Sequence, residues 1–227
     1  MSTDSGPISR RDELPGVERL LTLSDAVVAI ALTLLVLQLK VPTLAEVAHP
    51  TSAAELAAQL GKDADQVISY VVSFYVIAQF WLLHYRVFRQ VAGQREGLVW
   101  WNFAFLFTIT VMPFTSSLLG DYGSNPLAVD IFAVNLLLAS LATQATLLYG
   151  RRKRLLNPGA DPRDMRAGLT RAGATAVVFG LSIGLAWVNT RVAMYSWLLI
   201  AVAPRAADRW SARHGARTPG SNRRTTD

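Results

Sequence analysis

One apolar run near the start of the chain limits the folds that this sequence can adopt. Between Ala26 and Leu39 only Thr33 and Gln38 are polar, and all other side chains are aliphatic. A helix of this composition has no polar face to offer to water, so it requires a membrane or a deep protein core.

Further apolar blocks separated by short charged connectors favour the membrane. The chain is 52% hydrophobic and 17% charged, and a spanning helix needs about 20 mostly apolar residues. We expect a first helix from Leu20 or Ser24 to Leu39, capped by Thr22 or Ser24 and stopped by Pro42. Further helices are expected over residues 67–88, 98–119, 127–149, 168–188 and 192–203, the last short of a full span. The sequence therefore predicts an all-α, polytopic membrane protein with six transmembrane helices.

The basic residues predict the orientation of these helices. The formal charge is +6, which in a soluble protein would suggest nucleic-acid binding. With six spans and a cytoplasmic N-terminus, however, every lysine and arginine except Lys40, Lys62 and Arg191 falls on the cytoplasmic side. We therefore expect both termini in the cytoplasm, with residues 1–18 as a cytoplasmic segment, 19–207 as the transmembrane domain, and 208–227 as a basic, disordered tail.

A stripe of side chains stands out within the first apolar run. Ile30, Thr33, Leu34 and Leu37 follow the spacing i, i+3, i+4, i+7 and share one helical face. If copies of this helix faced a common axis, the stripe would line a narrow hydrophobic channel, and such a constriction can gate by losing its water. The structural alternative is that these side chains face lipid or the protein core.

Two ionisable residues fall at the same expected membrane level. Asp25 opens the first helix, where it is either functional or an acid stabilised by the helix dipole. His84, at the inner end of the second helix, is either a partner of Asp25 that titrates near neutral pH or a structural histidine. No Ser-His-Asp order, phosphate loop or HExxH pattern occurs, so we expect neither an enzyme nor a bound cofactor or metal.

Three segments resemble one known family. Arg19-Leu-Leu-Thr-Leu-Ser24-Asp25 resembles the R-x-x-x-F-S-D signature of prokaryotic members of the transmembrane protein 175 family, relatives of the endolysosomal potassium channel. The segment FWLLHYRVF is similar to that family's second-helix block, and NFAFLFTITVMPFTSSLLG resembles its third helix. The resemblance covers residues 19 to about 120 and departs at Leu23, where the family has phenylalanine.

The resemblance implies a homotetramer in which four first helices line a potassium-selective pore without a P-loop. In it, Ile30 would form the first constriction, Leu34 and Leu37 further layers, and Thr33 a ring of hydroxyls that favours potassium. A cytoplasmic-side polar network would hold the bundle together, and it would contain Arg19, Ser24, Asp25, Trp81, His84 and Asn102.

The function that we expect is thus a leak-like potassium channel in a bacterial inner membrane. Its partners would be its own copies and the lipid bilayer, with no nucleic acid and no small-molecule substrate, and potassium would be the permeating ion. The alternatives are a multi-pass cation or proton-coupled transporter that uses Asp25 and His84, and a structural membrane protein without flux.

Overall fold

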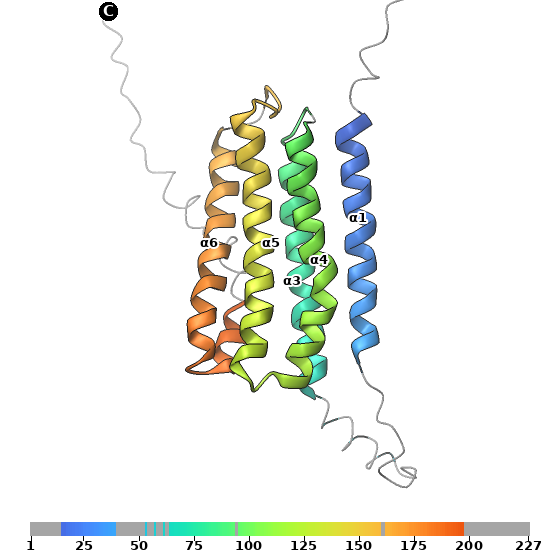
Figure 1. Ribbon diagram of the computed structural model, residues 1–227, viewed down its shortest axis with the longest axis vertical. Helices are drawn as coiled ribbons and strands as arrows, with labels where there is room; N and C mark the ends of the chain where they lie inside the picture. The colour runs from blue at the N-terminus through green and yellow to red at the C-terminus, as the bar shows by residue number, and fades with distance from the viewer. Residues whose placement is uncertain are drawn as a thin grey trace, which may run out of the picture.

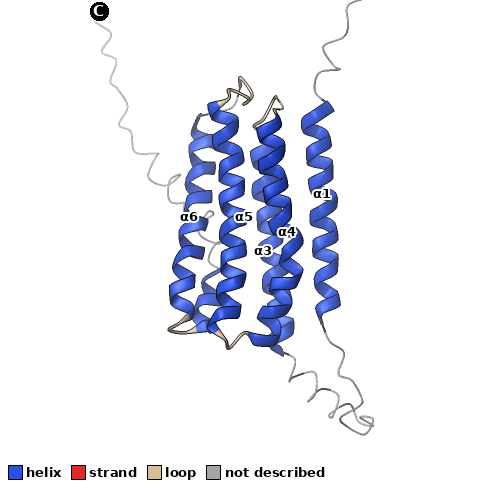
Figure 2. Cartoon of the chain, in the orientation of Figure 1, coloured by secondary structure: helices blue, strands red, loops and turns tan. Residues whose placement is uncertain are grey.

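The computed structural model describes most of the chain between residues 15 and 197. The described residues are 15–39, 53, 57, 61, 64–93, 95–159 and 162–197. Within them the chain is helical apart from short turns and one isolated bridge between Val91 and Leu156 (Figure 1, Figure 2). The predicted all-α class is confirmed for this part of the chain.

The first apolar run forms helix α1, which covers Pro15–Leu35 and continues as η1, one turn of 3-10 helix over Val36–Gln38. The other helices are α3 (Ala64–Phe88), α4 (Glu96–Tyr122), α5 (Pro126–Arg152) and α6 (Pro162–Ala186). Residues 190–197 are also helical. The rest of the predicted sixth helix, Pro42, Lys40, Lys62 and the segments 1–14 and 198–227 lie outside the described residues.

The start of α1 differs from the prediction. Thr22 and Ser24 were expected as N-caps, but the helix begins at Pro15 and both lie inside it. The Thr22 hydroxyl donates to the Glu18 carbonyl at 2.9 Å, and that of Ser24 lies 2.7 Å from the Leu20 carbonyl. These bonds to the preceding turn are typical of hydroxyl residues in a helix interior, so the cap prediction was wrong.

Prolines set the first residue of three helices. Pro15, Pro126 and Pro162 begin α1, α5 and α6. At the first helical position the missing N–H has no partner to lose, and the fixed φ angle already suits the helix. This explains why α6 begins before the predicted Gly168.

The helices form a bundle in which α1 occupies one edge. α4 packs against α1, α3 and α5, while α5 also packs against α3 and α6. Figure 1 shows α1 and α6 at opposite sides, with α3, α4 and α5 between them. Four helices of the described chain are long and apolar enough to span a membrane: α1 with η1, α3, α4 and α5.

A small second core closes the end of the bundle at which α1 begins. The turn after α3 and the turn after α5 meet there, because the Ala92 amide donates to the Leu155 carbonyl at 2.7 Å and the Asn157 amide to the Gln90 carbonyl at 2.8 Å. The buried side chains beneath these turns are Leu20, Phe88, Val91 and Leu98. The first turns of α1 therefore rest on a platform built from two distant loops.

Candidate functional site

The predicted stripe lies on the surface of the subunit. Ile30 is 58% exposed, Leu34 is 43% exposed and Leu37 is 76% exposed, and Thr33 is exposed as well. The Thr33 hydroxyl donates to the Ile30 carbonyl at 2.8 Å, so its oxygen retains lone pairs that point away from the helix. The edge position of α1 leaves this face largely uncovered by the other described helices.

The stripe is not one continuous α-helical row. The α-helix ends at Leu35, and Leu37 belongs to the 3-10 turn. A 3-10 helix turns by about 20° more per residue than an α-helix. Leu37 is therefore rotated away from the row that the i+7 spacing predicted, although it stays exposed.

The opposite face of α1 is buried against α3 and α4. Its buried residues recur every three or four positions, and they are Leu20, Ser24, Val28, Ala31 and Leu35. The helix therefore has one face that the subunit covers and one that it leaves open.

A buried polar group joins three helices near the cytoplasmic end predicted for α1. The Oδ1 atom of Asn102 on α4 lies 3.1 Å from the Ser24 hydroxyl of α1 and 2.8 Å from Nε2 of His84 on α3. All three residues are at most 1% exposed. Because a carbonyl oxygen only accepts, Nε2 of His84 carries the proton of this bond.

Aromatic side chains enclose His84. Its ring stacks on Phe88 and on Phe105, both with centroids 4.4 Å apart. Within the described residues, Nδ1 of His84 and Nδ2 of Asn102 are buried without a hydrogen-bond partner. The structural interpretation of His84 fits this packing, because the ring fills the space between two phenylalanine rings as well as making a hydrogen bond.

Asp25 forms a second bond beside this group. Its Oδ1 accepts from the indole N–H of Trp81 at 2.8 Å, and Trp81 precedes His84 by one turn of α3. The direct Asp25 to His84 hydrogen bond that the sequence suggested is not formed, since each side chain bonds to a different partner. The helix-dipole explanation fails too, because α1 begins at Pro15 and the dipole acts within the first turn.

Arg19 does not join these bonds. It is exposed, and no hydrogen bond or ion pair links it to another described residue. Eleven residues separate it from Ile30, which is close to three helical turns, so the two share the open face of α1. The structure thus brings together five of the six predicted network residues and places Arg19 on the other side of the helix.

Sequence reasoning missed a second anchor of α1. The Gln38 amide, at the end of η1, donates to the backbone carbonyl of Pro113 on α4. Gln38 lies 14 residues after Ser24, about 21 Å along the helix. The only sequence signal was that Gln38 is polar within an aliphatic run. Hydrogen bonds thus tie this segment to α4 at two levels, near the middle of α1 and at the end of η1.

This arrangement lies within the part of the chain that matches a known family. Residues 19–113 match the family model described as endosomal/lysosomal potassium channel TMEM175. A protein of Chamaesiphon minutus named as a potassium channel is 30% identical over 184 residues, which cover 77% of this chain and 88% of that protein. This chain belongs to the TMEM175 family.

Other relatives extend the comparison. A protein of Streptomyces collinus, also named a potassium channel, is 29% identical over 184 residues, 79% of this chain and 86% of that protein. Human TMEM175, named an endosomal/lysosomal proton channel, is 30% identical over 140 residues, 56% of this chain and 25% of that protein.

The crystal structure of a TMEM175 homologue from Chamaesiphon minutus shares the fold. It superposes with a TM-score of 0.72 at 22% identity and covers 84% of this chain and 97% of that chain. The five hydrogen-bonded network residues and the open face of α1 all fall within the range matched by the TMEM175 family model.

Proposed function

We propose that this protein is a potassium channel of a bacterial inner membrane, in which four copies of α1 line the pore. The names of the Chamaesiphon and Streptomyces relatives support the ion, and family membership supports the class. The permeating ion is potassium, and no bound cofactor takes part.

The open face of α1 carries this proposal. One helix cannot enclose a pore, so the exposed stripe acquires a function only where copies of the subunit meet around an axis. Two anchors fix the buried face of α1, through Ser24 and Gln38, and thereby fix the direction in which Ile30 and Thr33 point. A homotetramer of six-span subunits satisfies this requirement.

Each residue of the stripe has a role in such a pore. Ile30 forms the first hydrophobic constriction, and Leu34 and Leu37 add further layers. A ring of aliphatic side chains imposes a barrier, because ions cross it only when it is wetted. Thr33 supplies a ring of hydroxyl oxygens that replaces part of the water around the ion.

The charges of the bundle support the orientation. At the end where α1 begins, the exposed basic residues are Arg19, Arg86, Arg89, Arg95, Arg151, Arg152, Lys153 and Arg154. At the other end the described basic residue is Arg191. Positive residues are retained in the cytoplasm, so the end with the polar network faces inward.

The test is potassium flux into liposomes that contain the purified, sized oligomer. Ile30→Asn is expected to raise the flux about tenfold, which corresponds to about 1.4 kcal/mol off the barrier. Leu181→Asn is the matched control, since Leu181 is 70% exposed on α6 and outside the proposed pore. Equal fluxes of wild type and Ile30→Asn, or an equal rise in the control, contradict the proposal.

Selectivity is tested in the same assay with potassium, sodium and a proton gradient. Thr33→Ala is expected to lower the ratio of potassium to sodium flux, because it removes the hydroxyl ring. An unchanged ratio removes Thr33 from the site. The measurement with a proton gradient tests whether this chain also conducts protons, since the human relative is named a proton channel.

The transporter alternative requires a working pair of Asp25 and His84. The two bond to Trp81 and Asn102 instead, and His84 is closed in between two phenylalanines. Saturable flux with counterflow would favour the transporter, whereas single-channel currents favour the pore.

A further inference from the structure

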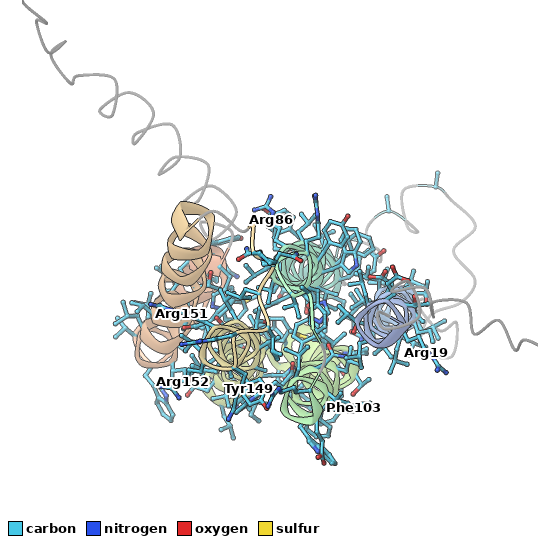
Figure 3. All side chains as sticks on the ribbon, turned by 90° about the horizontal axis from the view of Figure 1, so that it is seen from above. Arg19, Arg86, Phe103, Tyr149, Arg151 and Arg152 are labelled. Atoms are coloured by element: carbon cyan, nitrogen blue, oxygen red, sulfur yellow. The ribbon has the colours of Figure 1, made fainter. Side chains whose placement is uncertain are left out.

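The end of the bundle at which α1 begins carries basic side chains that the proposed pore does not use. We define the basic rim as the exposed basic side chains in the last turns of α3 and α5 and in the connections that follow these helices, namely Arg86, Arg89, Arg95, Arg151, Arg152, Lys153 and Arg154. Figure 3 looks down on this end and shows Arg86, Arg151 and Arg152 away from Arg19, which lies across the bundle.

The rim is held in place by hydrogen bonds between the two turns. Besides the bonds of Ala92 and Asn157, the Gly93 amide donates to the Leu155 carbonyl at 3.2 Å, and the Asn157 side-chain amide donates to the Arg89 carbonyl at 3.0 Å. The guanidinium of Arg89 also lies 5.9 Å from the ring centre of Tyr85. These arginines are therefore presented on a fixed backbone.

Arg154 occupies a position that usually belongs to glycine. Its φ angle is 54°, the only positive value of a residue other than glycine in the described chain. The Leu155 amide donates to the Gly150 carbonyl at 2.8 Å and the Arg154 amide to the Arg151 carbonyl at 3.2 Å. These two bonds define a Schellman motif, in which glycine removes the strain of the left-handed residue. A strained arginine at this place points to a function for its side chain.

Few acidic groups oppose the rim. Among the residues at this end whose side chains the structure describes, the carboxylates are Glu18, Glu96 and Asp25, and Asp25 accepts from Trp81. The Glu96 carboxylate lies 3.5 Å from the indole nitrogen of Trp100, one turn further along α4. No salt bridge links a rim residue to another described residue, so the rim keeps its positive charge.

The position of the basic rim relative to the membrane indicates which kind of partner it binds. Arg151 and Arg152 are the last residues of a candidate span, and Arg89 follows directly after another. Basic residues at the cytoplasmic end of a span lie at the level of the lipid phosphates. We propose that the basic rim binds the anionic headgroups of phospholipids in the leaflet around it.

Lipid bound there would also stabilise the start of α1. Leu155 and Leu156, on the same turn as Arg154, pack on the small core that contains Leu20 of α1. A headgroup that bridges the two turns therefore holds the platform under α1. This proposal stands whether or not α1 lines a pore.

The experiment measures lipid binding to the purified protein in detergent by native mass spectrometry, with phosphatidylglycerol as the anionic lipid and phosphatidylcholine as the neutral one. Wild type is expected to bind phosphatidylglycerol at least tenfold more tightly. Arg154→Gly is expected to weaken that binding about fivefold, the effect of one basic residue near a membrane surface. Its melting temperature should stay equal or rise, because glycine relieves the left-handed strain.

Two further variants sharpen the result. Arg89→Gln with Arg154→Gly is expected to weaken phosphatidylglycerol binding about thirtyfold, if the two effects add. Arg191→Gln, at the opposite end, is the matched control and should bind as wild type does. Equal affinities for the two lipids, or equal losses in Arg154→Gly and the control, overturn the proposal. Loss of phosphatidylglycerol binding in the presence of millimolar inorganic phosphate also overturns the proposal, because that result shows that the rim binds a free anion.

Discussion

The two faces of α1 are nearly alike in composition, and yet the subunit covers one and leaves the other open. The covered face presents Ser24, Val28, Ala31 and Leu35. The open face presents Ile30, Thr33, Leu34 and Leu37. Lipid tails are as apolar as leucine, so hydrophobicity cannot tell these faces apart. The polar groups determine which face is buried, because Ser24 and Gln38 form hydrogen bonds with residues of α4.

A comparison of whole helices gives the same lesson. In the most apolar stretch of α1, 28% of the residues are buried within the subunit, whereas in that of α5 the share is 56%. α5 lies between α4 and α6 and buries polar residues such as Ser140 and Thr143. In a membrane, burial follows from small and hydrogen-bonding side chains more than from apolar ones.

The largest expected effect separates two adjacent leucines. Leu35→Ala should destabilise the subunit by about 3 kcal/mol, because Leu35 is fully buried and leaves a cavity against α3 and α4. Leu34→Ala should cost under about 1 kcal/mol while altering ion flux. Thermal unfolding in detergent measures the first quantity and liposome flux the second. Equal destabilisation by the two variants would show that both faces are packed.

An intermediate effect is expected at the buried polar group. Asn102→Leu removes the oxygen that Ser24 and His84 share, and it leaves Nε2 of His84 buried without an acceptor, whereas the Ser24 hydroxyl keeps the Leu20 carbonyl. We expect a loss of about 2 kcal/mol in unfolding free energy and a weaker oligomer on cross-linking. Thr110→Val is the control, since the Thr110 hydroxyl bonds only within its own exposed helix turn. A loss in the control as large as in Asn102→Leu would remove the special role of this group.

The smallest effect concerns Arg19, which shares the open face with Ile30. In the proposed tetramer, four copies of Arg19 surround the cytoplasmic mouth and lower the local potassium concentration. Arg19→Gln should therefore raise flux about twofold at low ionic strength, with no rise at 1 M salt and no change in stability. Arg191→Gln removes a positive charge at the opposite end, away from both α1 and the basic rim, so flux should not respond. If Arg19→Gln lowered stability and left flux unchanged, Arg19 would have the structural role that the resemblance implied.

The sequence by itself determined where along the chain the helices lie, to within a few residues. It also determined that successive helices cross the bundle in opposite directions. Apolar runs of spanning length left no other fold class, since an unpaired backbone cannot lie in lipid. Polarity within apolar runs singled out Asp25 and His84, whereas Ser24, Trp81 and Asn102 were expected only from the family resemblance, and the pairing of these residues was not predictable from spacing.

Tertiary structure alone decided the partners. Whether His84 bonds to Asp25 or to Asn102 depends on how α3 and α4 rotate about their axes, and that rotation is set by packing across all neighbouring helices. The same holds for the loops after α3 and α5, whose sequences carry no sign that Val91 pairs with Leu156. Local sequence fixes a helix through contacts within four residues, whereas the face that it buries is fixed by side chains far away in the chain.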